Sequence, residues 1–284
     1  MSDIKSTTSV SGRIAKCAVY CIMIFFTVMA VYPLFWLLMS SLKTTQEYQL
    51  TSKLSFPKAW WFENYSGAWV RGKFELLFLN SILYTGISTA AIVLLSSSAG
   101  FALAKLQNKA SKYIYASFVI GMLITLQCIM VPLFILTCKT GLYDTHLGIL
   151  ICYTGIGLPL GIYLSTEFIK SIPDSIIESA RIDGATFFKI FRSIIFQMIK
   201  PVAVTITILT ASSTWNEFML INILASSETV KSLPVGIQKF SGALAADYGK
   251  QFAALVIGMI PMLVFYLFFR KQITKGVVAG AVKG

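Results

Sequence analysis

Charged residues are scarce in this sequence. Only 13% of its 284 residues are Asp, Glu, Lys or Arg and 56% are hydrophobic, whereas a soluble domain carries about 25% charged residues. The deficit excludes an ordinary soluble domain and indicates a chain that crosses a lipid bilayer several times. The net charge of +12 does not point to nucleic acid, because no soluble domain is left to bind it. In membrane proteins an excess of Lys and Arg reports topology.

Groups that bind metals or nucleotides are equally sparse. The single histidine, His146, falls in a short loop, and no Gly-rich phosphate loop, zinc-ligand spacing or dinucleotide fingerprint occurs. Cys17 and Cys21 stand one helical turn apart, but neither a second pair nor a histidine accompanies them, so we interpret them as packing residues. We therefore expect no metal site, no cofactor, no catalytic residue and no enzyme activity.

Six long apolar runs divide the chain. The first is uncharged for 26 residues from Cys17 to Leu42. It is longer than the core of a signal peptide and can span about 30 Å of hydrocarbon. Residues 1–12 are rich in Ser and Thr and are expected to be disordered, with residues 13–284 forming one transmembrane domain. The predicted fold is all-α, with six transmembrane helices at about 17–42, 76–104, 113–138, 147–166, 201–227 and 251–269.

Small and aromatic residues refine this prediction. The small residues 96–100 allow a neighbouring backbone to approach closely, so we expect the second span in the bundle interior. The Gly- and Pro-rich stretch 155–161 predicts a bend or a break in the fourth span. Between the first two spans, Trp60, Trp61 and Trp69 are of the type that sits at a membrane interface, and we expect short interfacial helices there.

The distribution of charge predicts the orientation of the chain. With six spans, both termini lie on one side, together with the loop 105–112 and the polar segment 167–200. This side has 15 Lys and Arg against five acids, and the opposite side has nine against six. By the positive-inside rule, the side with both termini is cytoplasmic.

The segment 167–200 is the longest polar, helix-patterned stretch. Pro173 and Gly184 delimit a short helix within it, because the residue before a proline avoids helical backbone and glycine favours the left-handed conformation that ends a helix. Asp174 or Ser175 can cap this helix. Ser175, with a glutamate three residues later, fits a capping box.

Side-chain spacing predicts what the segment contacts. Glu178 and Arg181 are spaced i, i+3 and can pair on the first helix. That helix would present Ile176, Ile177, Ser179 and Ala180. A second helix, 186–199, has basic residues opposite aromatic ones, as in helices that lie along a membrane. Its apolar face would hold Phe187, Phe191, Ile194, Ile195 and Met198, and its polar face Lys189, Arg192, Ser193, Gln197 and Lys200. A plain hairpin that only connects two spans is an equal alternative.

The same segment resembles the EAA motif, which marks the membrane subunits of binding-protein-dependent ABC importers. It reads Glu178-Ser179-Ala180-Arg181-Ile182-Asp183-Gly184-Ala185, followed by Phe191, Ile194 and Pro201. The resemblance implies the type I permease fold of ABC importers and a cytoplasmic coupling loop, 170–200, that docks on a separate ATPase subunit. Its implied coupling residues are Glu178, Ser179, Ala180, Asp183, Gly184, Ala185 and Phe191. Ser179 replaces the family's alanine. Gln197 replaces a common proline, which weakens the expected bend before the fifth span.

Two further stretches resemble the carbohydrate-type permeases of such importers. One, in the fifth span, reads Trp215-Asn216-Glu217-Phe218. The other is the end of the C-terminal tail, 270–284, which is similar to the smaller, second membrane subunit of maltose transporters. The resemblance implies that the tail contacts the ATPase subunits through Ala279, Gly280, Lys283 and Gly284. It makes Trp215, Asn216 and Glu217 candidates for the substrate path. Alternatively, Glu217 bonds helices to one another and Trp215 is a packing residue.

The resemblance implies a multi-pass permease subunit in the bacterial plasma membrane. It would form the path for a sugar, such as a di- or oligosaccharide, with a second homologous permease. A dimer of ATPase subunits would drive transport, and an extracellular sugar-binding protein would deliver the sugar. The outward loop 228–250 would contact that protein, with Gly236, Gly242 and Gly249 providing mobility. The alternatives are a non-sugar solute and an ion-coupled secondary transporter. The latter is disfavoured because only one acid interrupts a span and no internal repeat occurs.

Overall fold

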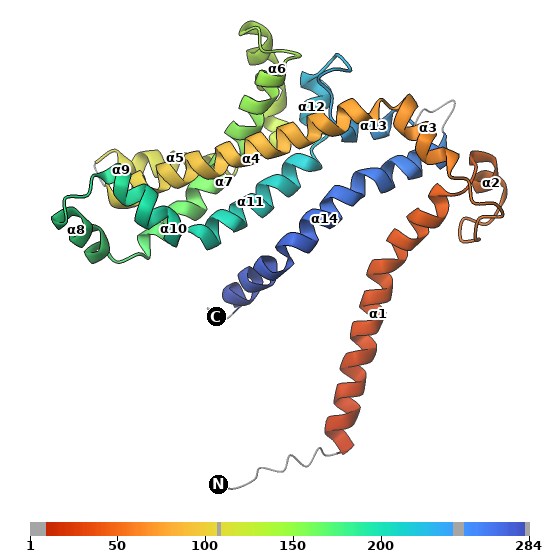
Figure 1. The fold of residues 1–284 in the computed structure, drawn as a ribbon, viewed down its shortest axis with the longest axis horizontal. Coiled ribbons are helices and arrows are strands. Elements are labelled where there is room, and N and C mark those ends of the chain that lie inside the picture. Colours follow the sequence, from red (N-terminus) through yellow and green to blue (C-terminus); the bar gives the residue numbers. More distant parts are fainter. Residues whose placement is uncertain (1–9, 107–108, 241–246, 282–284) are drawn as a thin grey trace. The chain divides into compact units, whose positions relative to one another are not determined.

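The computed structural model describes residues 10–106, 109–240 and 247–281, and every regular element within these ranges is helical (Figure 1). The prediction of an all-α fold is therefore confirmed. The chain divides into two compact units. The first unit comprises residues 1–68 and 240–257, and the second comprises residues 69–239 and 258–284.

The first unit contains one long helix and several short elements. The long helix begins within the segment predicted to be a disordered tail, and residues 1–9 lie outside the described ranges. The loop after it forms short helices, as predicted. The elements are α1 (Val10–Ser41), α2 (Thr45–Leu50), most of α3 (Glu63–Arg71) and the start of α14 (Tyr248–Ala281).

Two kinds of contact hold the first unit together. The Asn64 side-chain amide donates to the backbone carbonyls of Ser41 and Lys43, both at 2.8 Å. Tyr48 and Phe252 form an edge-to-face aromatic pair with centroids 4.9 Å apart. These contacts fix the end of α1 and the beginning of α14 on α2 and α3.

The second unit is built on three helices that run side by side (Figure 1). These are α4 (Phe74–Lys105), α7 (His146–Lys170) and α11 (Lys200–Trp215). Small residues allow α4 and α7 to approach closely: a Cβ added at Gly100 would lie 2.7 Å from Ser165 Cβ. This confirms that the second predicted span is an interior helix.

The third predicted span, 113–138, is not a single straight helix. It is divided into α5 (Ser111–Gly121) and α6 (Leu126–Lys139), which meet at 104°. By contrast, α7 continues as one helix through Pro159, so of the predicted bend or break in the fourth span the break is wrong, and the bend stays a prediction. The break falls in the third span, where no Gly–Pro cluster indicated it.

The remaining elements form the polar segment 167–200 and the chain after it. The fifth predicted span, 201–227, is divided where α11 ends at Trp215. The sixth, 251–269, is part of a longer helix that continues through most of the predicted tail. The elements are α8 (Asp174–Ile182), α9 (Phe187–Ile190), the π-helical turn η1 (Phe191–Ile195), α10 (Phe196–Met198), α12 (Met219–Leu224) and α13 (Leu233–Gln238).

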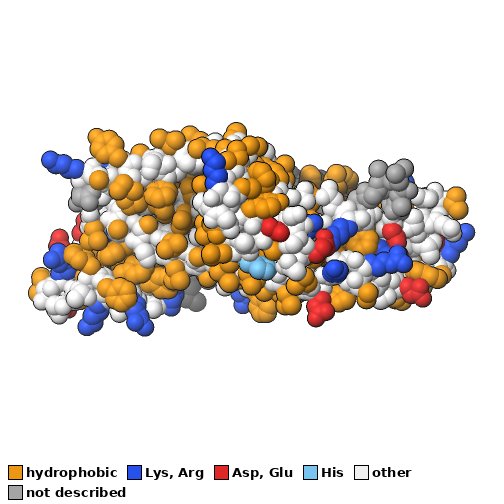
Figure 2. Space-filling view, turned by 90° about the horizontal axis from the view of Figure 1, so that it is seen from above, with side chains coloured by type: hydrophobic (Ala, Val, Ile, Leu, Met, Phe, Trp, Pro, Cys, Tyr) orange, Lys and Arg blue, Asp and Glu red, His pale blue; other side chains and the backbone are white. Residues whose placement is uncertain are grey.

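The described helices have the length and apolar composition that membrane-spanning helices need. Four are long and apolar enough to cross one, namely α1, α4, α7 and α14, and counting each of two bent helix pairs as one span gives six. The face seen in Figure 2 exposes hydrophobic side chains over much of its surface. Such a surface suits contact with lipid or with partner helices rather than with water.

Candidate coupling site

Helix α8 begins two residues earlier than the predicted capping box requires. Pro173 occupies the N-cap position and offers no side-chain acceptor. Ser175 therefore lies inside the helix, where its carbonyl accepts a 2.8 Å hydrogen bond from the Ser179 hydroxyl. The capping box of Ser175 and Glu178 is thus wrong, and the proline alone sets where the helix starts.

The other end of α8 explains the Asp-Gly-Ala sequence that follows it. Gly184 has a φ of +77°, the left-handed conformation that costs a residue with a Cβ about 1–2 kcal/mol. Its N–H donates to the Arg181 carbonyl at 3.0 Å, and the N–H of Ala185 donates to the Ala180 carbonyl at 2.9 Å. These two bonds form a Schellman motif, so the predicted helix stop at Gly184 is confirmed.

Helix α8 has an inward apolar face and an outward polar face. Ile177 is buried, with Ile176, Ala180 and Ala185 half-buried beside it in one core cluster with residues of α4 and α7. Of the four residues that α8 is predicted to present, only Ser179 is exposed; the prediction is wrong for Ile176, Ile177 and Ala180, because the helix rests on the core through them. The exposed side chains of the helix and its C-cap are Asp174, Ser175, Glu178, Ser179, Arg181, Ile182 and Asp183, and that of Ile182 is 86% exposed.

The charges on α8 pair differently from the prediction. Within the described residues, no ion pair joins Glu178 to Arg181. The guanidinium of Arg181 instead lies over the Phe187 ring, 4.7 Å from its centroid. At the start of the helix, Asp174 pairs with Lys105 at 2.6 Å. A groove of about 390 Å³ runs between these charges.

The second helix of the segment contains an irregular turn that changes its faces. The π-helical turn η1 adds one residue, so Ile190 and Ile195, five apart, both lie fully buried, followed by Ile199. Phe187 and Met198, predicted on the apolar face, are exposed. A regular 3.6-residue period could not predict this arrangement.

Phe191 connects this helix to α4. Its ring centroid lies 5.7 Å from that of Phe101, which is buried. Phe191 is therefore a packing residue beneath α8 rather than part of the exposed surface. Thr186 begins the helix, since its hydroxyl accepts the N–H of Lys189.

The bend before α11 does not need a proline at position 197. The helices over Phe187–Met198 and Lys200–Trp215 meet at 74°. Pro201 lies in the first turn of α11, where its missing N–H is tolerated, and Gln197 is exposed. The expectation that Gln197 weakens this bend is wrong.

The three predicted path residues lie where α11 ends. The indole N–H of Trp215 donates to the Gly258 carbonyl at 3.2 Å, and the Asn216 amide donates to the Ser212 carbonyl at 2.8 Å. Glu217 accepts hydrogen bonds from the Tyr153 hydroxyl and from two backbone N–H groups of α12. Glu217 thus bonds helices to one another and Trp215 is a buried packing residue, as the alternatives for the two predicted, and a role in the substrate path stays a prediction.

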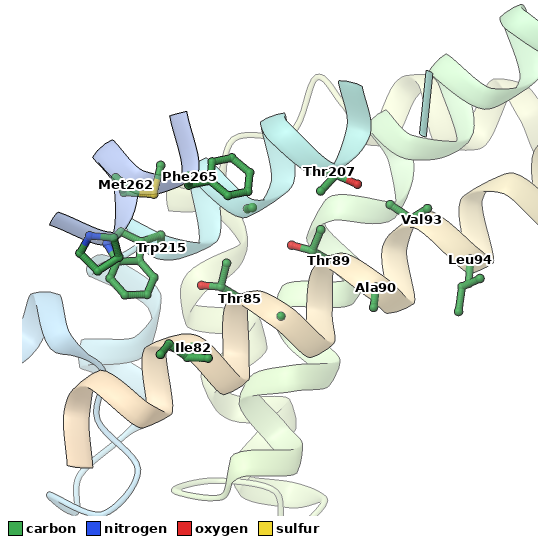
Figure 3. Close-up of a pocket in the computed structure, with 13 residues that line it drawn as sticks. Ile82, Thr85, Thr89, Ala90, Val93, Leu94, Thr207, Trp215, Met262 and Phe265 are labelled. Atoms are coloured by element: carbon green, nitrogen blue, oxygen red, sulfur yellow. The ribbon is translucent and has the colours of Figure 1, made fainter. Parts of the chain in front are cut away.

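Trp215 also lines a mainly apolar cavity of about 640 Å³ between α4, α11 and α14 (Figure 3). The cavity lies within the second unit. Its walls are apolar apart from a few threonine side chains, so it offers no charged group to a solute. Lining residues include Ile82, Thr85, Thr89, Thr207, Met262 and Phe265.

The segment predicted as a mobile outward loop is held firmly where it is described. The amide of Asn80 on α4 donates to the carbonyls of Thr229 and Lys231 at 2.8 and 2.9 Å. A Cβ at Gly236 would lie 2.2 Å from Leu77 Cδ1. Gly236 therefore serves close packing, and Gly249 does so in the first unit, against the Lys43 carbonyl. Gly242 lies outside the described residues.

Asp144 fixes the other side of this segment. Its carboxylate accepts the N–H groups of Ser226 and Ser227, both at 2.9 Å, and the Ser227 hydroxyl at 3.0 Å. Partial burial alone would raise the pKa of this carboxyl, but the hydrogen bonds from Ser227 and Ser226 outweigh it, so the pKa lies below its ordinary value. The carboxylate is therefore ionised at neutral pH.

The C-terminal residues are only partly described. Ala279 and Gly280 belong to the last turns of α14, so the predicted tail is helical at least to Ala281. Lys283 and Gly284 lie outside the described residues. In the part of the chain that the structure describes, no group of three or more His, Cys, Asp or Glu could hold a metal ion.

Two residues that hold the site together were not predicted from the sequence. Lys105 fastens α8 to α4, and Asp144 fastens the 225–227 loop. A weak signal existed for Lys105, since it is the first cation after a long apolar run. For Asp144, with a φ of +55°, the sequence offered only that aspartate tolerates the left-handed conformation.

The helical fold and its candidate spans are those of a multi-pass membrane protein. Residues 96–277 match the family described as "Binding-protein-dependent transport system inner membrane component". The chain therefore belongs to a family of membrane transport subunits, and the matched range contains both the predicted coupling loop, 170–200, and the end of α11. It is therefore an inner-membrane protein with several membrane helices, as predicted.

Curated relatives align over nearly the whole chain. The chain is 34% identical to the melibiose/raffinose/stachyose import permease protein of Bacillus subtilis (strain 168), over 89% of this chain and 91% of the relative. It is 31% identical to the trehalose transport system permease protein of Mycobacterium tuberculosis, over 90% of this chain and 93% of the relative. A solved bacterial ABC transporter involved in the import of the acidic polysaccharide alginate has the same fold. It aligns with a TM-score of 0.81 and 24% identity, covering 93% of this chain and 98% of that chain.

Proposed function

We propose that this chain is a permease subunit of a binding-protein-dependent ABC importer for a di- or oligosaccharide, and that a second homologous permease completes the translocation path. The observation that carries the proposal is the construction of α8. This short helix ends in a Schellman motif, rests on the core through Ile177 and exposes a polar face with Ile182 at its end. Such a helix is held rigidly from behind and is free on its outer side to dock on a partner.

The docking partner is a dimer of ATPase subunits in the cytoplasm. Of the predicted coupling residues, Glu178, Ser179, Asp183 and Gly184 are exposed and would form the contact. Ala180, Ala185 and Phe191 are half-buried and support the helix from below. ATP hydrolysis belongs to the partner, and closure of the ATPase dimer would move α8. The end of α14, with Ala279 and Gly280, and the following Lys283 and Gly284 would form a second contact with the ATPase.

The orientation follows from the position of α8. We place both termini, the 105–112 loop and the coupling loop on the cytoplasmic side. The segment 229–238 then faces outward and forms a fixed platform for an extracellular sugar-binding protein. Asn216, which is exposed, and Trp215, beside the cavity, are the residues that we propose for the path.

The sugar class is supported by the relatives, which are import permeases for melibiose, raffinose and stachyose and for trehalose. Binding of an oligosaccharide panel to the cognate binding protein tests this part. Affinity for a di- or oligosaccharide is expected. Exclusive affinity for a glycerol phosphate or a polyamine would reject the sugar assignment and leave the permease assignment standing.

The permease assignment is tested by reconstitution with the second permease and the ATPase. Gly184→Pro removes the N–H donor to Arg181 and imposes an incompatible φ, so ATP-driven uptake should be lost while membrane insertion persists. Gly155→Ala is the matched control, because a Cβ there meets nothing within 4 Å and the backbone is helical. Full uptake by the Gly184→Pro transporter would contradict the proposed role of α8.

A further inference from the structure

One cation joins the coupling helix to the longest interior helix of the second unit. Lys105 is the last residue of α4, and its side chain is only 7% exposed. Its ammonium donates to the Ile172 carbonyl and to Asp174 Oδ1, both at 2.6 Å. Ile172 is buried in the link between α7 and α8, and Asp174 is the first residue of α8. A single ammonium thus holds both the link and the helix.

This ion pair differs from the others in the described part of the chain. The other four join residues no more than 11 positions apart. Lys105 and Asp174 are separated by 69 positions. An exposed pair contributes little, and Asp174 is 74% exposed. The Lys105 side chain, however, is buried, so the loss of its partners would leave a buried cation, which is costly.

Apolar packing beneath the ion pair makes the connection rigid. Ala104 and Phe101 of α4 lie in the same core cluster as Ile177 of α8. The cluster extends to Ile190 and Ile195 of the second cytoplasmic helix. Helix α8 therefore contacts α4 in two places: through a polar contact at the start of α8 and through an apolar contact at the middle of α8. A displacement of α8 would act on α4 through both contacts.

The N-terminal end of α4 contacts the 229–238 segment, which is the platform proposed for the sugar-binding protein. Asn80 and Tyr84 donate to carbonyls between Thr229 and Lys231, and the Ser81 hydroxyl accepts the N–H of Leu233. Because α4 is one uninterrupted helix of 32 residues, its two ends move together. A rigid element with a specific contact at each end is a physical means of carrying a displacement between distant sites.

We infer that Lys105 is the positioning residue that transmits movement of α8 to α4, and through α4 to the 229–238 segment. The inference rests on the proposed function of α8. Lys105 acts through its two hydrogen-bond acceptors, Asp174 and the Ile172 carbonyl. Its loss should therefore reduce the amount of solute moved per ATP hydrolysed, while the transporter still assembles and hydrolyses ATP.

The test uses the complete transporter in proteoliposomes with its binding protein. Lys105→Met retains a long apolar side chain but removes the donor. We expect normal co-purification with the ATPase and a fall of about fivefold or more in solute transported per ATP, the lower range of allosteric coupling. Lys139→Met is the control, since that lysine is exposed at the end of α6, outside both the coupling loop and the 229–238 segment, and its ratio should not change.

A charge reversal separates positioning from a merely structural role. Lys105→Glu alone should uncouple transport, and adding Asp174→Lys should restore the ratio to within about twofold because the pair is re-formed. An unchanged ratio in Lys105→Met, failure of that variant to assemble, or no recovery in the reversed pair would each overturn the inference. Failure of the proposed function is distinguishable, because the unmodified chain would then show no ATPase partner and no ATP-driven uptake.

Discussion

The hydroxyl of Tyr153 on α7 donates a 2.8 Å hydrogen bond to Glu217 Oε2, in the break between α11 and α12. The same carboxylate accepts the N–H of Leu220 at 2.7 Å and that of Ile221 at 3.1 Å. One acidic side chain therefore caps the start of α12 and fastens it to α7. A carboxylate is suited to this because it favours the positive end of a helix and can accept several bonds.

Removing this carboxylate should destabilise the protein. Glu217→Ala leaves two N–H groups and one hydroxyl without their acceptor, which should lower the free energy of unfolding by about 1–3 kcal/mol. Thermal melting of the detergent-purified protein measures the change. Asn216→Ala is the control and should melt close to wild type, because that exposed amide bonds only the Ser212 carbonyl. Unchanged melting with loss of transport would instead make Glu217 a group that contacts the solute.

Gly184 should tolerate a side chain poorly even though space is available for one. A Cβ there meets nothing within 4 Å, so the whole effect of Gly184→Ala comes from its φ of +77°. We expect the free energy of unfolding to fall by about 1 kcal/mol. The ATPase should also co-purify more weakly, because the end of α8 frays. Gly155→Ala, in a helix and equally uncrowded, should be neutral or slightly stabilising. Equal effects of the two substitutions would contradict the strain argument.

Substitution of Gly236 should be unfavourable because of close packing rather than because of its backbone conformation. Gly236→Ala would force a Cβ to within 2.2 Å of Leu77 Cδ1, and Leu77 is fully buried. We expect a loss of about 1–3 kcal/mol of unfolding free energy, measured by thermal melting. Adding Leu77→Ala should produce a smaller loss than the two single losses together, because the second change removes the clash. Strict additivity would show that the two residues do not touch.

Acid should weaken the contact made by Asp144. Its folded-state pKa lies below the ordinary value of about 3.9, so its contribution to stability is fully present above that value and is lost as pH falls through the folded pKa. Asp144→Asn keeps a residue that tolerates the positive φ but removes the charge. We expect it to melt lower than wild type at pH 7, with the gap closing as the pH is lowered below about 4. A constant gap across this range would show that the charge is unimportant.

The sequence was sufficient to predict features that depend on residues close together in the chain. Gly184 ended α8 as predicted, because only glycine takes the left-handed conformation without strain. The small residues at 96–100 correctly predicted that α4 is an interior helix. The capping box failed because Pro173 already fixes the first helical residue, and the loop glycines Gly236 and Gly249 were misjudged because glycine serves mobility and close packing alike.

The sequence by itself determined the all-α membrane class, the six apolar runs and the end of α8 at Gly184, since each depends on composition or on signals a few residues apart. Only the tertiary structure decided where a span breaks, which face of a helix is buried and which charges pair. The π-helical turn at 191–195 shifts the buried face by one residue, and Lys105 meets Asp174 only because α4 and α7 pack together. These outcomes depend on contacts between residues far apart in the chain, which periodicity and short motifs do not encode.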